Sequence, residues 1–482
     1  MNTGTILWLG GAFFLAFLTY LLPGLARFFS VLGAAGSLGY GVALLGGQAP
    51  VSLHLLDHFG VSLLLDEQAA FFVLTNALVT LAVTFATWNT QTPFFCAQLL
   101  ILHGSLNVAF AVTDGVSLYV ALEVVAIAAF LLMTITGQER LIWVGLRYLF
   151  VSNVAMLFYL VGAVLVYEAQ GSFAWQGLRG APPEAKALLV LGLLVKGGVF
   201  LLGFWLPMTH AEVAAPVSAL LSGVVVKAPL LALVRMGGVA PELEALVRGV
   251  GVATAGVGGG GALGERDVKR LLAWSTMSQL GFVLAAPAVG GFYALTHGLS
   301  KAALFLAAGR LPSRELPQLQ SQGVDWGVAL PLALAGLSVC GLPGLAGYGA
   351  KTLTMQHLWS WQGGALTAAA VGTAMVYGQV LFLPWRRGEG LPWGYGLGLG
   401  VLIGGLLLAN GWYVGAFTWE ELGKAWLTIA LGWGLYWGIS RRWTVPWPRT
   451  GEQLEHLLGM MSLGLVAVFS WVWLWSERSC CG

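Results

Sequence analysis

Long apolar segments recur along the whole chain, and they are the feature that most constrains its fold. Segments of 18 or more apolar residues are long enough to cross about 30 Å of hydrocarbon as helices. Only 9% of the 482 residues are charged, whereas soluble domains carry roughly 25%. Because a soluble protein must cover its surface with polar groups, lipid must be the solvent for most of this chain. The sequence therefore predicts an all-α polytopic membrane protein without a sizeable soluble domain.

The apolar pattern predicts about 16 membrane spans joined by short loops. The first segment, Ile6 to Leu22, has no basic leader, so we interpret it as a membrane helix and not as a removed signal peptide. The longest polar connections are expected near 47–67, 168–184 and 440–457. The spans are expected near 5–22, 25–46, 68–89, 94–113, 115–134, 142–167, 185–206, 213–236, 244–263, 270–289, 290–311, 327–347, 364–384, 393–413, 423–439 and 458–476.

Charge and cysteine content exclude several classes of function. A net charge of +2 is too small to indicate nucleic-acid binding. Cys96 and Cys340 lie in apolar segments and are expected to be core residues. The terminal Cys480-Cys481 pair could be lipidated or bind metal, but a frayed tail is the favoured interpretation. No CxxC pair occurs, and no signature for quinone, flavin, nicotinamide or metal is present, so we expect no cofactor in this chain.

The distribution of basic residues predicts an orientation. Most of the loop lysines and arginines fall on the side that the first span reaches. Cytoplasmic loops carry the excess of Lys and Arg. The N-terminus is therefore expected on the outer side, periplasmic or lumenal, of a bacterial inner membrane or a thylakoid-type membrane.

Several charged side chains interrupt the apolar segments. Charges at membrane depth are costly and usually mark a function. Glu123 can neutralise at most one lysine, so the other lysines must be neutral, hydrated, or paired through water or histidine. The alternative is that the charges only fix helix packing, as we expect for the lone His103 in its apolar span. We favour a hydrated, titratable line. Its candidate residues are Glu123, Lys196, Lys227, His297, Lys301 and Lys351, with His297 and Lys301 on one helix face.

Two lysine-bearing segments are also expected to be broken. Gly197 and Gly198 follow Lys196, with Pro207 closing the same span, and Gly341 and Pro343 precede the other lysine, Lys351. Broken helices at membrane depth are tolerated where the freed backbone faces protein or a water-filled cavity. Two such segments, one in each half, favour an inverted-repeat transporter over glycine-rich helices without function. At 196–200 we predict an irregular or π-type turn with carbonyls facing water.

Residues 60–360 resemble the antiporter-like subunits shared by respiratory complex I, the multisubunit Mrp cation/proton antiporters and the membrane-bound hydrogenases. Five blocks carry the resemblance in family order and spacing. They are TDGVSLYVALE (113–123), FWLPMTHAEVAAPVSALLSGVVVK (204–227), ERDVKRLLAWSTMSQLGFV (265–283), THGLSKAALFLAAG (296–309) and GLPGLAGYGAK (341–351).

The resemblance implies fourteen core helices, with two inverted five-helix repeats around broken helices seven and twelve, plus about two C-terminal helices. It implies N-terminal helices at 1–93, half-channels at 94–236 and 244–384, and C-terminal helices at 385–482. The site residues then match as follows: Glu123 in helix five, Lys196 in helix seven, Lys227 in helix eight, His297 and Lys301 in helix eleven, and Lys351 in helix twelve. Protons would enter one half-channel, pass laterally and leave by the other, with Glu123–Lys196 as an electrostatic gate.

The chain also departs from the family pattern. Many relatives have proline after the helix-seven lysine and histidine before WLP, where this chain has Gly197, Gly198 and Gly203. Many have aspartate after WLP, where Met208 stands here. The break is therefore expected to be made by glycine, with a different set of neighbours.

The resemblance implies a proton-translocating subunit of a multisubunit complex. An Mrp-type monovalent cation/proton antiporter is favoured, with weak support from Lys351. The alternatives are a pump subunit of an NADH- or ferredoxin–quinone oxidoreductase or of a membrane-bound hydrogenase, whose redox centres would lie on other chains, and a scaffold that has lost transport. Expected partners are other membrane subunits, the lipid bilayer, protons and, in an antiporter, Na⁺ or K⁺.

Overall fold

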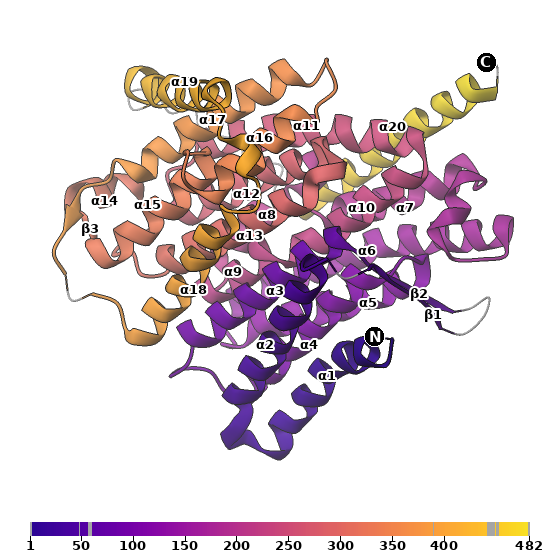
Figure 1. Cartoon of the computed structure of the whole chain (residues 1–482), viewed down its shortest axis with the longest axis horizontal. Helices are drawn as coiled ribbons and strands as arrows, with labels where there is room; N and C mark the ends of the chain where they lie inside the picture. Colours follow the sequence, from indigo (N-terminus) through magenta and orange to yellow (C-terminus); the bar gives the residue numbers. More distant parts are fainter. Residues whose placement is uncertain are drawn as a thin grey trace.

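Helices make up almost the whole chain (Figure 1). The computed structural model describes residues 2–47, 49–55, 60–388, 390–440, 449 and 453–480. The first ten helices are α1 (Asn2–Leu21), α2 (Ala26–Leu45), α3 (Glu67–Ala86), α4 (Pro93–Ala111), α5 (Gly115–Thr134), α6 (Glu139–Gln170), α7 (Pro183–Lys196), α8 (Trp205–Glu212), α9 (Ala215–Gly223) and α10 (Ala228–Val239). The others are α11 (Pro241–Leu263), α12 (Val268–Ala285), α13 (Gly290–Ala308), α14 (Leu316–Gln322), α15 (Trp326–Cys340), α16 (Ala346–Gln356), α17 (Gly363–Leu381), α18 (Trp393–Ala409), α19 (Trp419–Leu435) and α20 (Leu454–Cys480).

The lengths of the apolar helices are those of an integral membrane protein. Among the described residues, 10 helices are long and apolar enough to cross a bilayer, or up to 12 if each of two bent pairs forms one span. The apolar helices α15 and α18 are shorter than a full span. About 16 spans were expected, and the difference arises because hydropathy alone does not show where a segment bends or falls short. One bent pair, Val268–Ala285 with Pro287–Ala308, turns through 106° where two separate spans were expected.

The order of helices is the same in the two expected half-channels. The first contains α4, α5, α6, the interrupted α7–α8 and the interrupted α9–α10. The second contains α11, α12, α13, the interrupted α15–α16 and α17, with the short α14 inserted. A broken helix therefore stands fourth in each half. The inverted relation between the halves stays a prediction.

Short polar side chains fix where several of these helices begin. Asp66, Thr92 and Asp114 stand directly before α3, α4 and α5, and each side chain accepts a hydrogen bond from a backbone N–H of the first turn. Such caps satisfy donors that the helix itself leaves free. The cap at Asp114 sets the start of α5, which carries Glu123.

A β-hairpin lies where a polar connection was expected near 47–67. Strand β1 (Val51–Leu55) pairs antiparallel with β2 (Val61–Leu65), with Val51 opposite Leu65. The hairpin docks on the start of α5, because the Ser62 N–H donates to Asp114 Oδ2 at 3.0 Å. Two further strands, β3 (Val324–Asp325) and β4 (Trp385–Arg386), form a short parallel pair.

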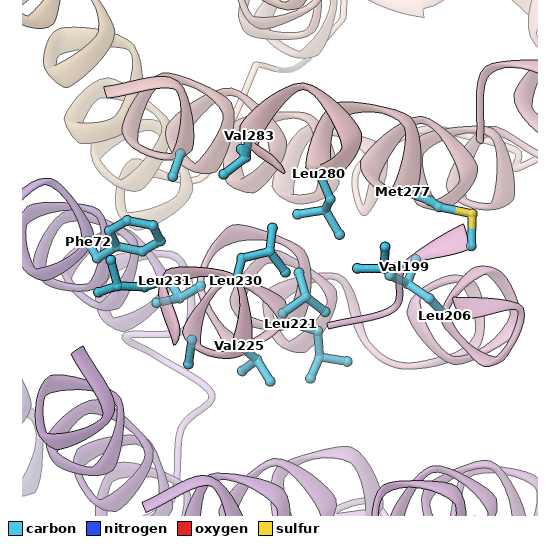
Figure 2. Close-up of a cluster of buried hydrophobic side chains, with 14 of the residues drawn as sticks. Phe72, Val199, Leu206, Leu221, Val225, Leu230, Leu231, Met277, Leu280 and Val283 are labelled. Atoms are coloured by element: carbon cyan, nitrogen blue, oxygen red, sulfur yellow. The ribbon is translucent and has the colours of Figure 1, made fainter. Parts of the chain in front are cut away.

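An apolar cluster fills the space between two interrupted helices (Figure 2). Its side chains come from α3, from the segment around the α7–α8 interruption, from α9–α10 and from α12. The labelled members are Phe72, Val199, Leu206, Leu221, Val225, Leu230, Leu231, Met277, Leu280 and Val283. Because lipid tails are as apolar as these side chains, close packing and not water exclusion holds them together.

The last two long helices lie in different parts of the molecule (Figure 1). Helix α19 packs against α17, whereas α20 packs against α7 and α11. Cys96 and Cys340 are buried, as predicted. Helix α20 runs to Cys480, and Cys481 lies outside the described residues, so the frayed tail stays a prediction.

Candidate functional site

The single carboxylate of the predicted line, that of Glu123, contacts the first of its lysines. Lys196 Nζ lies 3.5 Å from Glu123 Oε1, and the lysine side chain is only 4% exposed. Lys196 also donates to the Ser152 hydroxyl. With its nitrogen turned toward the carboxylate, the Asn153 amide lies 3.2 Å from Glu123 Oε2. Residues from α5, α6 and α7 therefore meet at one polar point, where Lys196 is buried and the Glu123 side chain is 20% exposed.

The helix carrying Lys196 ends at that residue. Gly197 keeps a right-handed helical conformation, but Gly198 takes φ +66°, which favours glycine. A 3-10 turn (Phe200–Gly203) follows, and the α7 and α8 segments differ in direction by 41°. The predicted break is present, as an irregular turn without π-type widening.

One detail of the expected break is wrong, and another stays a prediction. The Trp205 indole donates to Val195 O at 2.8 Å, and the Val199 N–H donates to Leu194 O at 3.1 Å. Whether the carbonyls at 196–200 face water stays a prediction. Pro207 does not close the span. It lies in the first turn of α8, where a missing N–H costs no hydrogen bond.

Gly198→Ala is expected to lower the melting temperature of the protein. A Cβ at this position would lie 2.6 Å from Leu206 Cδ1, and the left-handed conformation costs a non-glycine residue about 1–2 kcal/mol. Gly256→Ala in α11 is the matched control, because a Cβ there meets nothing within 4 Å. Equal melting temperatures for the two variants would show that the turn at Gly198 tolerates a side chain.

A third interruption surrounds Lys227 and was not predicted. Residues Val225–Lys227 form a 3-10 turn between α9 and α10. Lys227 is fully buried, and its Nζ donates to Ser222 O at 2.7 Å. The sequence signal for this turn is Pro229, which cannot donate a backbone hydrogen bond to the preceding turn.

His297 and Lys301 lie on α13, where their face meets α12, α15 and α17. Lys301 is fully buried and donates to Leu272 O and to the Tyr377 hydroxyl, both at 2.9 Å. Both ring nitrogens of His297 lack a hydrogen-bond partner among the described residues. The ring borders a small cavity of about 10 Å³, whose polar lining residues include Gln279, Tyr293, Thr296, Ser300 and Ser338. A cavity of this size is at the lower limit for holding one water molecule.

The second predicted break brings Lys351 to the carbonyl end of a helix. Helix α15 ends at Cys340, Gly341 takes φ +86° and Gly344 takes φ +95°, with Pro343 between them. Lys351 Nζ donates to Val339 O at 3.0 Å and to Cys340 O at 3.2 Å. The last carbonyls of a helix carry partial negative charge, so they favour a cation at this position.

The buried lysines of the line differ in the groups that they contact. Within the described part of the chain, Lys196 is the one lysine of the line that lies within 4 Å of a carboxylate. Lys227, Lys301 and Lys351 contact backbone carbonyls or a hydroxyl group. None of the three lysines points into lipid, because all are buried.

One buried histidine at this site was missed. His210 in α8 is fully buried between the rings of Trp205 and Phe305, and neither ring nitrogen has a hydrogen-bond partner among the described residues. Its sequence signal was its place in the block FWLPMTHAE, five residues after Trp205, whose indole bonds the Val195 carbonyl at the break. A buried, unpartnered imidazole is a candidate proton carrier.

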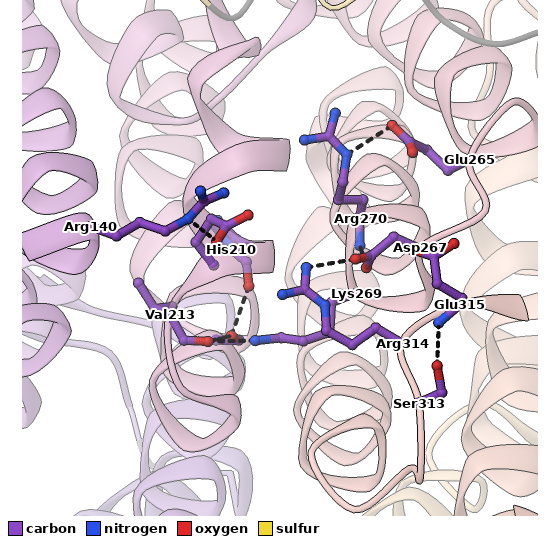
Figure 3. A network of polar contacts seen from close by, with 12 residues as sticks. Arg140, His210, Val213, Glu265, Asp267, Lys269, Arg270, Ser313, Arg314 and Glu315 are labelled. Carbon is purple, nitrogen blue, oxygen red and sulfur yellow. Dashed lines mark hydrogen bonds and ion pairs between the residues drawn. The ribbon is translucent and has the colours of Figure 1, made fainter. Parts of the chain in front are cut away.

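A network of ion pairs surrounds the end of α8 (Figure 3). Arg140 Nε lies 2.8 Å from Glu212 Oε2, and the Lys269 side chain donates to Val213 O. Asp267 pairs with Arg314 at 2.7 Å. The ERDVKR block therefore joins α8 to the start of α12 and fixes the segment that follows the first break.

His103 lies apart from the line. Its Nε2 is 2.7 Å from the Ser37 hydroxyl, and its Nδ1 is 3.0 Å from the Thr80 hydroxyl. Both ring nitrogens are thus satisfied within α2, α3 and α4, as a packed core residue requires. Within the described ranges, no group of three or more His, Cys, Asp or Glu residues could hold a metal ion.

Sequence comparisons identify relatives across the region that carries the line. Residues 113–376 match the family described as NADH:quinone oxidoreductase/Mrp antiporter, transmembrane. NADH-quinone oxidoreductase subunit N of Desulforudis audaxviator is 30% identical over 333 residues, covering 61% of this chain and 66% of the relative. NAD(P)H-quinone oxidoreductase chain 4 2 of Thermosynechococcus vestitus is 30% identical over 319 residues, covering 60% and 59%. The chain thus aligns with less than two thirds of each relative.

Two solved structures share the fold. The membrane-bound sulfane sulfur reductase, an archaeal respiratory membrane complex, contains a chain that matches with a TM-score of 0.75 at 23% identity, covering 90% of this chain and 98% of that chain. The Mrp complex from Dietzia sp. DQ12-45-1b contains one with a TM-score of 0.74 at 19% identity, covering 95% and 100%. Both matches extend the likeness in fold beyond residues 113–376.

Proposed function

Because the chain belongs to the family of NADH:quinone oxidoreductase and Mrp antiporter membrane subunits, we propose that it is the proton-translocating subunit of a multisubunit membrane complex. The observation that supports this most directly is the contact between Lys196 and Glu123 beside a broken helix. Three further buried lysines, Lys227, Lys301 and Lys351, contact neutral groups among the described residues. In our proposal they form the line between this contact and the second break. Such an excess of buried lysine is costly unless protons can leave and return.

The proposed mechanism moves a proton by changing the partners of a charge. At 3.5 Å and an effective dielectric near 20, the Glu123–Lys196 attraction is about 5 kcal/mol. When Lys196 leaves Glu123, its ammonium loses that stabilisation, which favours transfer of its proton to the next acceptor. The helix that carries Lys196 ends at this residue, so a change in the Gly197-Gly198 turn would move the lysine relative to Glu123. His210, Lys227, His297 and Lys301 would carry the charge onward to Lys351.

The first candidate for the parent complex is an Mrp-type antiporter that exchanges Na⁺ or K⁺ for protons. Lys351 at the second break is the residue that weakly favours it. We place this complex in a bacterial inner membrane or a thylakoid-type membrane, with the N-terminus of the chain on the outer side. Its other membrane subunits would be the partners of this chain.

The second candidate is a proton-pumping subunit of a redox complex. The curated relatives at 30% identity are subunits of quinone oxidoreductases, which favours this class. Redox centres would then lie on other chains of the complex. Both candidates require the same line of charged residues. They differ in the energy source that drives protons along it.

Purification through a tag on this chain, followed by transport assays, separates the candidates. For an antiporter, addition of Na⁺ or K⁺ to everted vesicles should collapse a preformed pH gradient, and the purified complex should lack iron–sulfur absorbance. Iron–sulfur absorbance together with acidification driven by an electron donor would support the redox complex instead. Absence of both activities in an intact complex would contradict proton translocation.

A further inference from the structure

A cavity lies beside Lys351, between α16, α17 and the C-terminal helix α19. It has a volume of about 210 Å³. Its polar lining comes from all three helices, and includes Lys351, Thr352, Thr367, Glu421, Lys424 and Thr428. Because one water molecule takes about 30 Å³ of liquid volume, several waters fit between the lysine and the carboxylate.

The inner end of this cavity is the lysine of the second break. Lys351 is about nine-tenths buried, at 8% exposure, and it donates to two backbone carbonyls. A lysine ammonium has three N–H donors, so these contacts leave one donor for a group in the cavity. Gly341, whose left-handed conformation ends α15, also borders the cavity and leaves the lysine uncovered on this side.

The other end is formed by the first two turns of α19. Thr418 caps this helix, and its hydroxyl accepts from the Glu421 N–H at 3.3 Å. The side chain of Glu421 is 17% exposed, whereas that of its neighbour Glu420 is 76% exposed. Lys424 bridges the two carboxylates, at 3.1 Å from Glu421 and 2.7 Å from Glu420. Of these two adjacent glutamates, only Glu421 lines the cavity.

We propose that this cavity is the passage between Lys351 and the membrane surface at which α19 begins, and that Glu421 is its terminal proton-exchanging carboxylate. A proton leaves Lys351 Nζ for a water oxygen, that water passes a proton on, and the last water protonates Glu421. Return of the proton to bulk water restores the carboxylate, and the same steps in reverse supply Lys351. This inference rests on the proposed function. It extends beyond the region that matches the family, because α19 lies outside residues 113–376.

Glu421→Gln tests the passage, with Glu420→Gln as the matched control in the same helical turn. In proteoliposomes containing the assembled complex, Glu421→Gln is expected to slow proton flux about tenfold or more, a moderate effect for loss of a positioned proton carrier. Glu420→Gln should leave the flux unchanged, because its carboxylate faces outward. Equal flux in the two variants would overturn the role of Glu421.

Thiol labelling tests the cavity without relying on transport. Because Cys340 also lines the cavity, the test uses a Cys340→Ser background. There a Thr352→Cys variant is expected to react with a membrane-impermeant methanethiosulfonate ammonium reagent from one side of the membrane, whereas the buried Cys96 in α4 should not react. Labelling of Thr352→Cys without proton flux in the wild type would contradict the proposed function and leave the cavity standing. Normal wild-type flux with no labelling would show that lipid or a partner fills the cavity, and would overturn the inference alone.

Discussion

Glu123→Gln is expected to reduce proton flux through the assembled complex about tenfold or more. The substitution keeps the shape of the side chain but removes the one carboxylate within 4 Å of Lys196 among the described residues. The lost attraction is about 5 kcal/mol, so Lys196 would no longer hold its proton in the same arrangement. Flux should be measured in proteoliposomes, with subunit content determined on the same sample.

Two variants separate loss of the gate from loss of structure. Glu168→Gln changes an exposed glutamate on α6 and should leave the flux intact. Glu123→Asp retains the charge on a shorter side chain and should restore part of the flux. Unchanged flux in a fully assembled Glu123→Gln complex would exclude the Glu123–Lys196 contact as a gate.

Lys227→Met is expected to abolish proton flux without destabilising the complex. Methionine fills a similar volume, and removal of a fully buried ammonium that contacts a carbonyl leaves no charge unpaired. The melting temperature should therefore stay equal or rise, whereas Glu123→Gln leaves Lys196 without its counter-charge and should lower it. If Lys227→Met and Glu123→Gln shift the melting temperature in opposite directions but reduce the flux to a similar extent, the loss of flux reflects impaired transport and not impaired folding.

Lys227→Arg provides the conservative variant for this position. Arginine keeps the positive charge but does not release its proton in proteins. If Lys227 carries a proton, Lys227→Arg should be as inactive as Lys227→Met. If Lys227 only supplies a positive charge, Lys227→Arg should retain flux, which would contradict a titrating role.

The sequence predicted the contact between Glu123 and Lys196 because the apolar segments contain few charged residues. A lone glutamate among buried lysines has few possible partners in an apolar protein, and the family resemblance implied Lys196 for Glu123. The breaks at Gly197-Gly198 and at Gly341 were predictable because glycine permits the left-handed backbone that ends a helix. These features depend on residue type more than on tertiary packing.

Features that depend on neighbouring elements were missed or misjudged. Pro207 indicates a helix end only if it stands outside the first turn, and the sequence does not show where that turn begins. The 3-10 turn at Lys227 depends on packing against α12 and α13, although Pro229 signals it weakly. The freed Val195 carbonyl is satisfied by Trp205, a partner ten residues away, and no local pattern predicts such a bond.

Helices α19 and α20 place contacts of the C-terminal region on both halves of the chain. Helix α19 packs on α17 in the second half, and α20 packs on α7 and on the 3-10 turn after the first break. At that turn the approach is close, because a Cβ on Gly464 would lie 2.6 Å from Leu202 Cδ2. A change in the backbone at the turn after Lys196 must therefore also displace α20, although α20 contributes no residue to the line of charges.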